Sequence, residues 1–150
     1  MYPNLHISVL AVLAAAVAGF LFGGLWYGPI AGKKWAELMG MSKEDCAGFS
    51  KAQMARCFIS SFVASLLTAY VLVHSMQAWM PSSWSAPMPD GPGYVYAFFG
   101  AFFAWLGYMV PPLLTANAWE KKSWQLCVLN GAFHFLHLQI IGLVLAYFPY

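Results

Sequence analysis

A polar stripe interrupts the last apolar segment of the sequence. The stretch LNGAFHFLHLQ, residues 129–139, contains Asn130, His134 and His137. On a helix turning by about 100° per residue, this i, i+4, i+7 spacing places the three side chains on one face. Polar side chains deep in a membrane usually face the interior of a helix bundle. The stripe therefore predicts either a binding or conduction site, or hydrogen bonds between helices.

A second stripe, of small polar side chains, runs along residues 53–80. Its members, which fall on one face of a helix, are Cys57, Ser61, Ser65, Thr68 and Ser75. Small hydroxyl side chains let helices approach closely and bond across the interface, typically for under about 1–2 kcal/mol each. The sequence therefore predicts a polar seam between the second and fourth helices. The candidate ligand-binding residues along it are Asn130, His134, His137, Ser61, Ser65 and Thr68.

Histidine also raises the question of a metal. Neutral imidazole is a common metal ligand, and a copper or haem site in the outer leaflet would use His6, His74 or His137. However, no carboxylate or cysteine is expected at the depth of His134 and His137, so we predict no metal and no other cofactor. All the Asp and Glu residues are assigned to loops, which argues against proton-coupled transport because membrane proton relays usually use buried carboxylates.

Signatures of catalysis are absent from the sequence. It contains no G-x-S-x-G, no H-E-x-x-H, no P-loop and no G-x-G-x-x-G in a strand–helix context. The cysteines Cys46, Cys57 and Cys127 show no C-x-x-C spacing, so they indicate reduced thiols rather than a disulfide framework or a zinc site. We therefore expect a protein that is not an enzyme.

The composition indicates that lipid surrounds these residues. The chain has 150 residues, enough for one domain, and 61% are hydrophobic while only 8% are charged. Soluble domains average about 25% charged residues. The low share of charged residues therefore indicates that a lipid bilayer covers much of the surface. The few basic residues form no patch of the kind that binds nucleic acid.

Four segments are long and apolar enough to span a membrane, which needs about 20 predominantly apolar residues. They cover approximately residues 5–27, 53–80, 94–119 and 124–148. The predicted fold is all-α: a single domain, residues 1–150, forming a bundle of four transmembrane helices.

Local signals predict where these helices begin and end. Gly28-Pro29 is expected to stop the first helix, and Pro111-Pro112 to break the third. Ser50 followed by Gln53 is a capping-box pattern that opens the second helix. Residues 33–39 could form a short helix at the membrane surface that ends at Gly40, although a solvated connector fits equally well.

The distribution of basic residues predicts the orientation. All seven Lys and Arg residues lie in the loops after the first and third spans, and none lies in residues 81–93 or in the tails. Cytoplasmic loops carry an excess of Lys and Arg. We therefore expect both termini and the loop of residues 81–93 on the non-cytoplasmic side of the membrane.

Small residues form a ridge on the first span. Ala11, Ala15, Gly19 and Gly23 follow each other at four-residue spacing, which allows two helix backbones to approach closely. The ridge predicts either a contact between copies of the chain or packing against the third span within one chain.

The two halves of the chain show a weak similarity. GFLFGGLWYGPIAGKKW, residues 19–35, and GAFFAWLGYMVPPLLTANAWEKKSW, residues 100–124, both run from Gly and Phe through Tyr and Pro to Lys-Lys and Trp. One interpretation is a parallel repeat of two helices. The other is the composition that membrane segments share by default.

Two stretches resemble a known family. FGGLWYGPIAGKKWAELMG, residues 22–40, and residues 104–145 are similar to the bacterial integral-membrane family catalogued as domain of unknown function 1761. The matching positions in the second half are Trp105-Leu106-Gly107, Glu120-Lys121-Lys122, Asn130, Phe133-His134 and Gly142. The resemblance implies four spans and supplies no reaction. His137 and Pro111-Pro112 depart from the family pattern, so a site with two histidines is not implied as a family function. A fainter similarity, through Trp26-Tyr27 and Lys34-Trp35, links the chain to tryptophan-rich translocator proteins, which have five spans.

Two functions remain open at this point. The first is a non-enzymatic bundle that forms homo-oligomers or serves as a subunit of a membrane complex. The second is a small binding or transport protein for a lipophilic ligand or an ion, with the polar seam as its site. A void that reaches the histidines would favour the second function, and a seam with every polar group paired would favour the first.

Overall fold

The computed structural model describes residues 3–42 and 48–148, and all regular structure in these residues is helical. Four helical segments are long and apolar enough to cross a membrane: Val9–Ile30, Lys51–Ala78, Gly93–Trp119 and Trp124–Tyr147. Their limits lie within four residues of those expected from hydropathy. The prediction of four apolar spans is therefore confirmed.

The first span is assembled from two helical pieces and the third from three. The first span contains α1 (Val9–Leu25) and the π-helical turn η1 (Trp26–Ile30), and it leads into the short helix α2 (Gly32–Leu38). The third contains α5 (Gly93–Ala104), the π-helical turn η3 (Trp105–Met109) and α6 (Val110–Trp119). The second span is α4 (Lys51–Ala78), followed by the 3₁₀ turn η2 (Pro81–Trp84), and the fourth is α7 (Trp124–Tyr147).

Serine side chains begin three of the long helices. The hydroxyls of Ser8, Ser50 and Ser123 accept hydrogen bonds from backbone N–H groups of the first turns of α1, α4 and α7. Ser50 and Gln53 form the complete capping box that the sequence predicts. The short helix expected near residues 33–39 is present as α2, and Gly40 follows it with a φ of 68°, in the left-handed region that favours glycine.

The two predictions about prolines had different outcomes. Gly28-Pro29 lies inside η1, and the first span ends one residue later, at Ile30, close to the predicted stop. Pro111-Pro112 do not break the third span, which continues to Trp119, so that prediction was wrong. Pro111 and Pro112 occupy the first turn of α6, immediately after η3. The first positions of a helix tolerate proline because their N–H groups have no intrahelical acceptor. A π-helical turn inserts an extra residue into the helix, and here it accompanies each proline without breaking the span.

Both π-helical turns contact α7 at the same level. The Tyr27 hydroxyl in η1 donates to Asn130 Oδ1 at 3.1 Å. The Trp105 indole in η3 donates to the carbonyl oxygen of Gly131 at 2.8 Å. Because Asn130 and Gly131 are adjacent in sequence, the two turns hold one short section of α7 from two sides.

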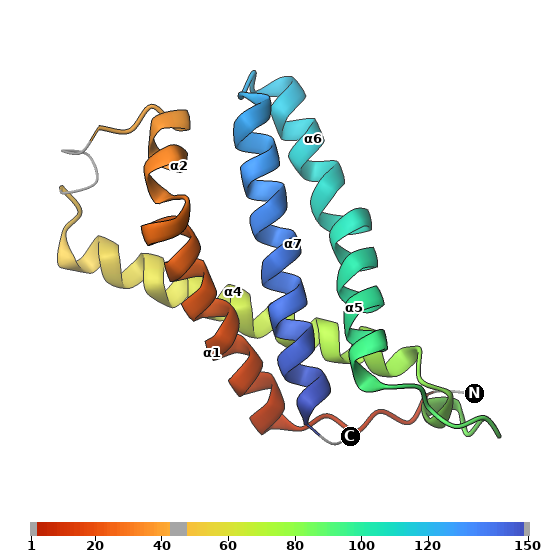
Figure 1. Ribbon diagram of the computed structural model, residues 1–150. Coiled ribbons are helices and arrows are strands. Elements are labelled where there is room, and N and C mark those ends of the chain that lie inside the picture. The colour runs from red at the N-terminus through yellow and green to blue at the C-terminus, as the bar shows by residue number, and fades with distance from the viewer. Residues whose placement is uncertain (1–2, 43–47, 149–150) are drawn as a thin grey trace.

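The helices are arranged around α7. It packs against α1 on one side and α5 on the other, while α4 crosses the group obliquely (Figure 1). The fully buried side chains at these contacts include Ala15 of α1, Ala69 and Met76 of α4, and Ile141 and Leu145 of α7. The core therefore lies where α4 crosses α1 and α7, which is also where Ser65 and His137 lie.

Large apolar side chains face outward along every span. Examples are Leu21 of α1, Ile59 of α4, Phe103 of α5 and Leu143 of α7, each more than half exposed. No more than a third of the most apolar window of any span is buried inside the protein. Only a lipid environment can cover so much apolar surface, so the chain is a multi-pass membrane protein.

The small-residue ridge of α1 is used inside the chain. Ala11, Ala15 and Gly19 are buried, and α1 packs against α4 and α7. These neighbours differ from the third span, which we expected as the intramolecular partner. The alternative of a contact between copies does not hold for this ridge either, because these three positions are already covered. Gly23 is half-buried beside Phe133.

Candidate functional site

The central polar contact joins α4 to α7. Ser65 Oγ and His137 Nε2 lie 3.2 Å apart and share a hydrogen bond. Ser65 is 3% exposed and His137 is 9% exposed, so both polar groups are almost fully removed from solvent and lipid. Buried polar groups are costly unless they are bonded, and this contact satisfies one ring nitrogen of His137.

Gly19 of α1 completes this contact region. A Cβ at Gly19 would lie 2.9 Å from His137 Nε2 and 2.8 Å from Ile141 Cδ1. Cβ atoms essentially never come this close to another heavy atom, so the imidazole occupies space that only glycine leaves free. Three helices therefore meet at His137, and the lack of a side chain at Gly19 of α1 leaves room for the imidazole ring.

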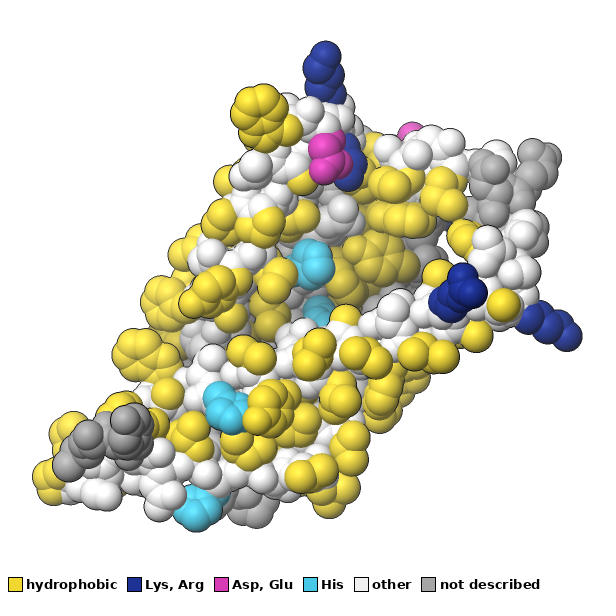
Figure 2. Space-filling view, turned by 180° about the vertical axis from the view of Figure 1, so that it is seen from behind, with side chains coloured by type: hydrophobic (Ala, Val, Ile, Leu, Met, Phe, Trp, Pro, Cys, Tyr) yellow, Lys and Arg dark blue, Asp and Glu magenta, His cyan; other side chains and the backbone are white. Residues whose placement is uncertain are grey.

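A groove opens from this point between α1, η1 and α4. Its volume is about 420 Å³, and its lining includes His137, Ser65, Ser61, Cys57 and Tyr27. Figure 2 shows the hollowed face of the molecule, with histidine side chains near its centre. The groove is mainly apolar and carries a few polar groups, of which Ser65 and His137 are buried, an arrangement typical of sites for small lipophilic molecules.

Glycines leave one wall of the groove open. Gly24 and Gly28 both line it, and a Cβ built at either position would meet no other atom within 4 Å. The protein's own packing therefore does not require glycine at these two positions. Their effect is to expose backbone and to widen the groove.

An aromatic cluster lies beside the groove, at the contact of α1 and η1 with α7. Phe133 stacks on Phe22 with ring centroids 5.9 Å apart, and it contacts Tyr27 at 4.7 Å and Trp26 at 6.3 Å. The indole nitrogen of Trp26 is buried and has no hydrogen-bond partner among the described residues. Aromatic pairs at such distances stabilise packing beyond the area they bury, so this cluster keeps η1 against α7.

The three residues of the stripe on α7 have three different partners. His137 bonds to Ser65 of α4 as described, whereas Asn130 bonds to Tyr27 of η1. His134 is half-buried, its ring lies against Phe133 with centroids 5.2 Å apart, and it makes no hydrogen bond within residues 3–42 and 48–148. The expected bond from His134 to Ser61, Ser65 or Thr68 is therefore wrong.

The stripe on α4 also divides. Ser61 and Ser65 line the groove, whereas Thr68 donates to the carbonyl oxygen of Ala64 in its own helix and lines a different pocket, beside α5 and η3. The physical reason is that α4 crosses its neighbours obliquely (Figure 1), so each neighbour contacts it over a short length. One stripe on α4 thus faces different helices in succession.

The histidines are not gathered into a metal site. No group of three or more potential metal ligands occurs in the described residues. His74 Nδ1 is bonded to the carbonyl oxygen of Tyr70 at 2.6 Å, and the backbone of His6 is bonded to Gln77. The alternative of a metal site that uses His6, His74 or His137 is therefore not assembled in the described residues. Cys46 lies outside the described residues.

Sequence reasoning missed several groups that shape the site. Tyr27 as the partner of Asn130 and Gly19 as the contact of His137 were not expected. Gln77 was also missed: it is 2% exposed and exchanges two hydrogen bonds with the backbone of His6, which ties the N-terminal segment to α4. The available signal was a glutamine in the last turn of α4.

A protein-family model matches most of the chain. The model described as "Protein of unknown function (DUF1761)" matches residues 10–146. The chain belongs to this family. Neither the curated proteins nor the solved structures contain a match to it. The match covers all four spans and every residue of the groove, so the groove of this DUF1761 protein lies inside the family region.

Proposed function

We propose that this protein is a non-enzymatic binding protein for a lipophilic molecule that carries a hydrogen-bonding group. The observation that carries the proposal is the groove of about 420 Å³ that ends at His137. Its apolar walls suit a molecule that enters from lipid. His137, Ser65 and Ser61 in its lining can form hydrogen bonds with a polar group of the ligand.

The open glycine wall supports the same function. Gly24 and Gly28 leave space that no side chain of the described residues fills. Glycine often marks a site where a ligand or another backbone approaches closely. A ligand in contact with α1 accounts for glycine at both positions.

The test compares two glycine-to-leucine variants by native mass spectrometry after mild detergent extraction. Gly24→Leu places a bulky side chain in the groove, whereas Gly107→Leu places one at another open position, in η3, outside the groove. We expect the wild type and Gly107→Leu to retain a bound lipophilic species, and Gly24→Leu to lose it. Equal retention by all three proteins would contradict the proposal.

A second candidate function is self-association or membership of a larger membrane complex. The observation that favours it is that every residue from Lys51 to Ser61 in α4 is exposed. This section carries polar side chains such as Gln53, Arg56 and Ser60, which a partner helix could cover. The same mass spectra report the number of copies, and a dimer with an empty groove would favour this second function.

The proposed location is the inner membrane of a bacterium, with both termini and the η2 region outside the cytoplasm. The orientation is supported by the distribution of charge, since all Lys and Arg residues lie within residues 33–56 and 121–122, near the ends of the first and third spans.

A further inference from the structure

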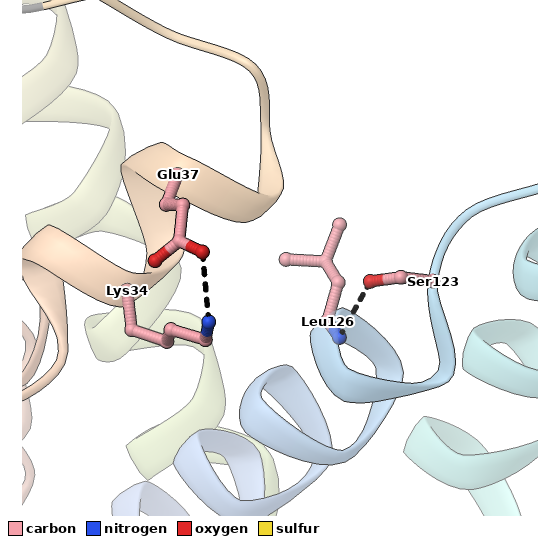
Figure 3. A network of polar contacts seen from close by, with 4 residues as sticks. All are labelled: Lys34, Glu37, Ser123 and Leu126. Carbon is pink, nitrogen blue, oxygen red and sulfur yellow. Dashed lines mark hydrogen bonds and ion pairs between the residues drawn. The ribbon is translucent and has the colours of Figure 1, made fainter.

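A second groove lies at the end of the molecule where α2 meets the start of α7. Its volume is about 490 Å³. Lys34 and Leu38 line it from α2, and Trp124, Gln125, Val128 and Leu129 line it from α7. Figure 3 shows this region from close by, with Lys34 on α2 and the first turn of α7 on either side of the gap. This groove shares no lining residue with the groove at His137.

The segments that flank this groove carry four lysines, of which Lys34 lines it. Lysines 33 and 34 lie at the start of α2, and lysines 121 and 122 lie just before α7. Two carboxylates oppose them: Lys34 Nζ lies 3.0 Å from Glu37 Oε1, and Lys122 pairs with Glu120. Lys33 and Lys121 form no salt bridge within the described part of the chain. The net charge at this end therefore favours an anion.

Both polar and apolar side chains line the groove. Lys34, Gln125 and the indole of Trp124 can donate hydrogen bonds. Leu38, Val128 and Leu129 supply apolar surface, and Val128 is 68% exposed, one turn into a membrane span. A free phosphate ion would use only the polar side chains, whereas a phospholipid would use both kinds.

The turn of residues 120–123, which precedes Trp124 and Gln125, is held in place. Ser123 Oγ accepts from the backbone N–H of Leu126 at 3.2 Å and caps α7 (Figure 3). With its amide oriented as a donor, buried Asn117 reaches the carbonyl oxygens of Lys122 and Ser123 at 2.7 and 3.1 Å. The backbone that carries Lys122 and Trp124 is thus fixed, which reduces the entropy lost when a ligand binds.

We propose that this groove binds a phospholipid with an anionic headgroup. The phosphate lies against Lys34, Gln125 and Trp124, and one acyl chain lies along Leu38, Val128 and Leu129. Basic pockets between transmembrane helices bind anionic headgroups in this way. The proposal does not depend on the ligand suggested for the groove at His137, because the two sites are separate.

The test measures retained lipid by native mass spectrometry of the full chain released from nanodiscs of phosphatidylcholine and phosphatidylglycerol in equal amounts. The variants are Lys34→Gln and, as a matched control, Lys33→Gln, which removes the same charge from the neighbouring position outside the groove. We expect the wild type to retain phosphatidylglycerol preferentially. Lys34→Gln should lower this retention about fivefold, as expected for one basic residue at a membrane surface, while Lys33→Gln should change it much less.

A second variant tests the acyl-chain wall. Val128→Trp fills the groove at an exposed position, so the fold should keep its thermal stability in detergent while retention of phosphatidylglycerol falls. Two results would overturn the proposal. One is an equal loss for Lys33→Gln and Lys34→Gln, which indicates diffuse attraction rather than a site. The other is equal retention of phosphatidylcholine and phosphatidylglycerol by the wild type.

Discussion

The contact at His137 depends on the hydroxyl of Ser65. Ser65→Ala removes the hydroxyl that bonds to His137 Nε2 and leaves a buried ring nitrogen without its partner. The expected loss of stability is about 1 kcal/mol, because an unsatisfied buried group costs about 1–3 kcal/mol while hydrogen bonds between membrane helices average about 0.6 kcal/mol. Unfolding in detergent by a denaturant measures this difference.

Ser75→Ala is the matched control for Ser65→Ala. Ser75 lies on the same helix, is exposed, and donates only to the carbonyl oxygen of Val71 one turn earlier. Its replacement should change stability by less than about 0.5 kcal/mol, as is usual for surface positions. If both alanine variants behave alike, the Ser65–His137 bond contributes nothing specific to the fold.

The glycines of α1 differ in what surrounds them. At Gly19 a methyl group would press on His137 and Ile141, at 2.8–2.9 Å, whereas at Gly24 it would meet nothing within 4 Å. Gly19→Ala should therefore destabilise the protein by about 1–3 kcal/mol, the usual cost of overpacking. Gly24→Ala should leave stability unchanged or raise it by up to about 1 kcal/mol, because alanine favours the helix.

Thermal unfolding of the two variants in the same detergent checks this prediction. A Gly19→Ala protein as stable as the wild type would mean that α1 lies farther from α7 than the structure places it.

At the scale of elements, the two π-helical turns allow a direct comparison of two tryptophans. The indole nitrogen of Trp105 donates to Gly131, but that of Trp26 is buried without a partner among the described residues. Trp105→Phe removes a hydrogen bond, whereas Trp26→Phe removes an unsatisfied donor. Trp105→Phe should therefore cost more than Trp26→Phe, by about 0.5–1.5 kcal/mol.

Both replacements keep an aromatic ring in its cluster, since Trp26 packs on Phe133 and Trp105 packs on Phe135. Denaturant unfolding of the two phenylalanine variants gives the comparison. An equal or reversed order of stability would indicate that the Trp105–Gly131 bond does not hold η3 on α7.

The elements themselves were largely predictable from the sequence. Apolar runs located all four spans, and the local pattern of Ser50 and Gln53 located the start of α4, because both signals depend on residues within a few turns. Pro111-Pro112 was wrongly predicted to break the third span. Whether a proline breaks a span or follows a π-helical turn depends on how that turn, here η3, contacts α7, which no local pattern contains.

The candidate site was predictable only in part, for a geometric reason. A helical wheel shows which side chains share a face, and it correctly grouped Ser61 with Ser65 along the groove. It does not give the crossing angle of α4, so it could not show that Thr68 turns toward a different pocket. Nor could it show that Asn130 bonds to Tyr27. The extra residue of a π-helical turn changes the direction of the side chains in η1 relative to those of α1.

At the scale of the whole molecule, two grooves with no shared lining residue have different chemistry. The groove at His137 is lined by glycine, hydroxyl and aromatic groups and carries no charged residue. The groove at Lys34 is amphipathic, and the segments that flank it carry four lysines. A neutral lipophilic molecule therefore suits the first and an anionic lipid the second, so loss of one ligand need not affect the other.

The orientation of the whole molecule gives the last prediction. The seven basic residues lie within residues 33–56 and 121–122 and none lies in the η2 region, so Met88 should face the outside and Lys33 the cytoplasm. Met88 is 65% exposed, whereas the nearby Ser83 is buried and unsuitable for labelling. In a background where the three native cysteines are replaced by serine, Met88→Cys should react with a membrane-impermeant maleimide added to intact cells. Lys33→Cys should react only after the membrane is made permeable. Labelling of Lys33→Cys but not Met88→Cys in intact cells would reverse the orientation, and it would place the proposed anionic-lipid groove in the outer leaflet.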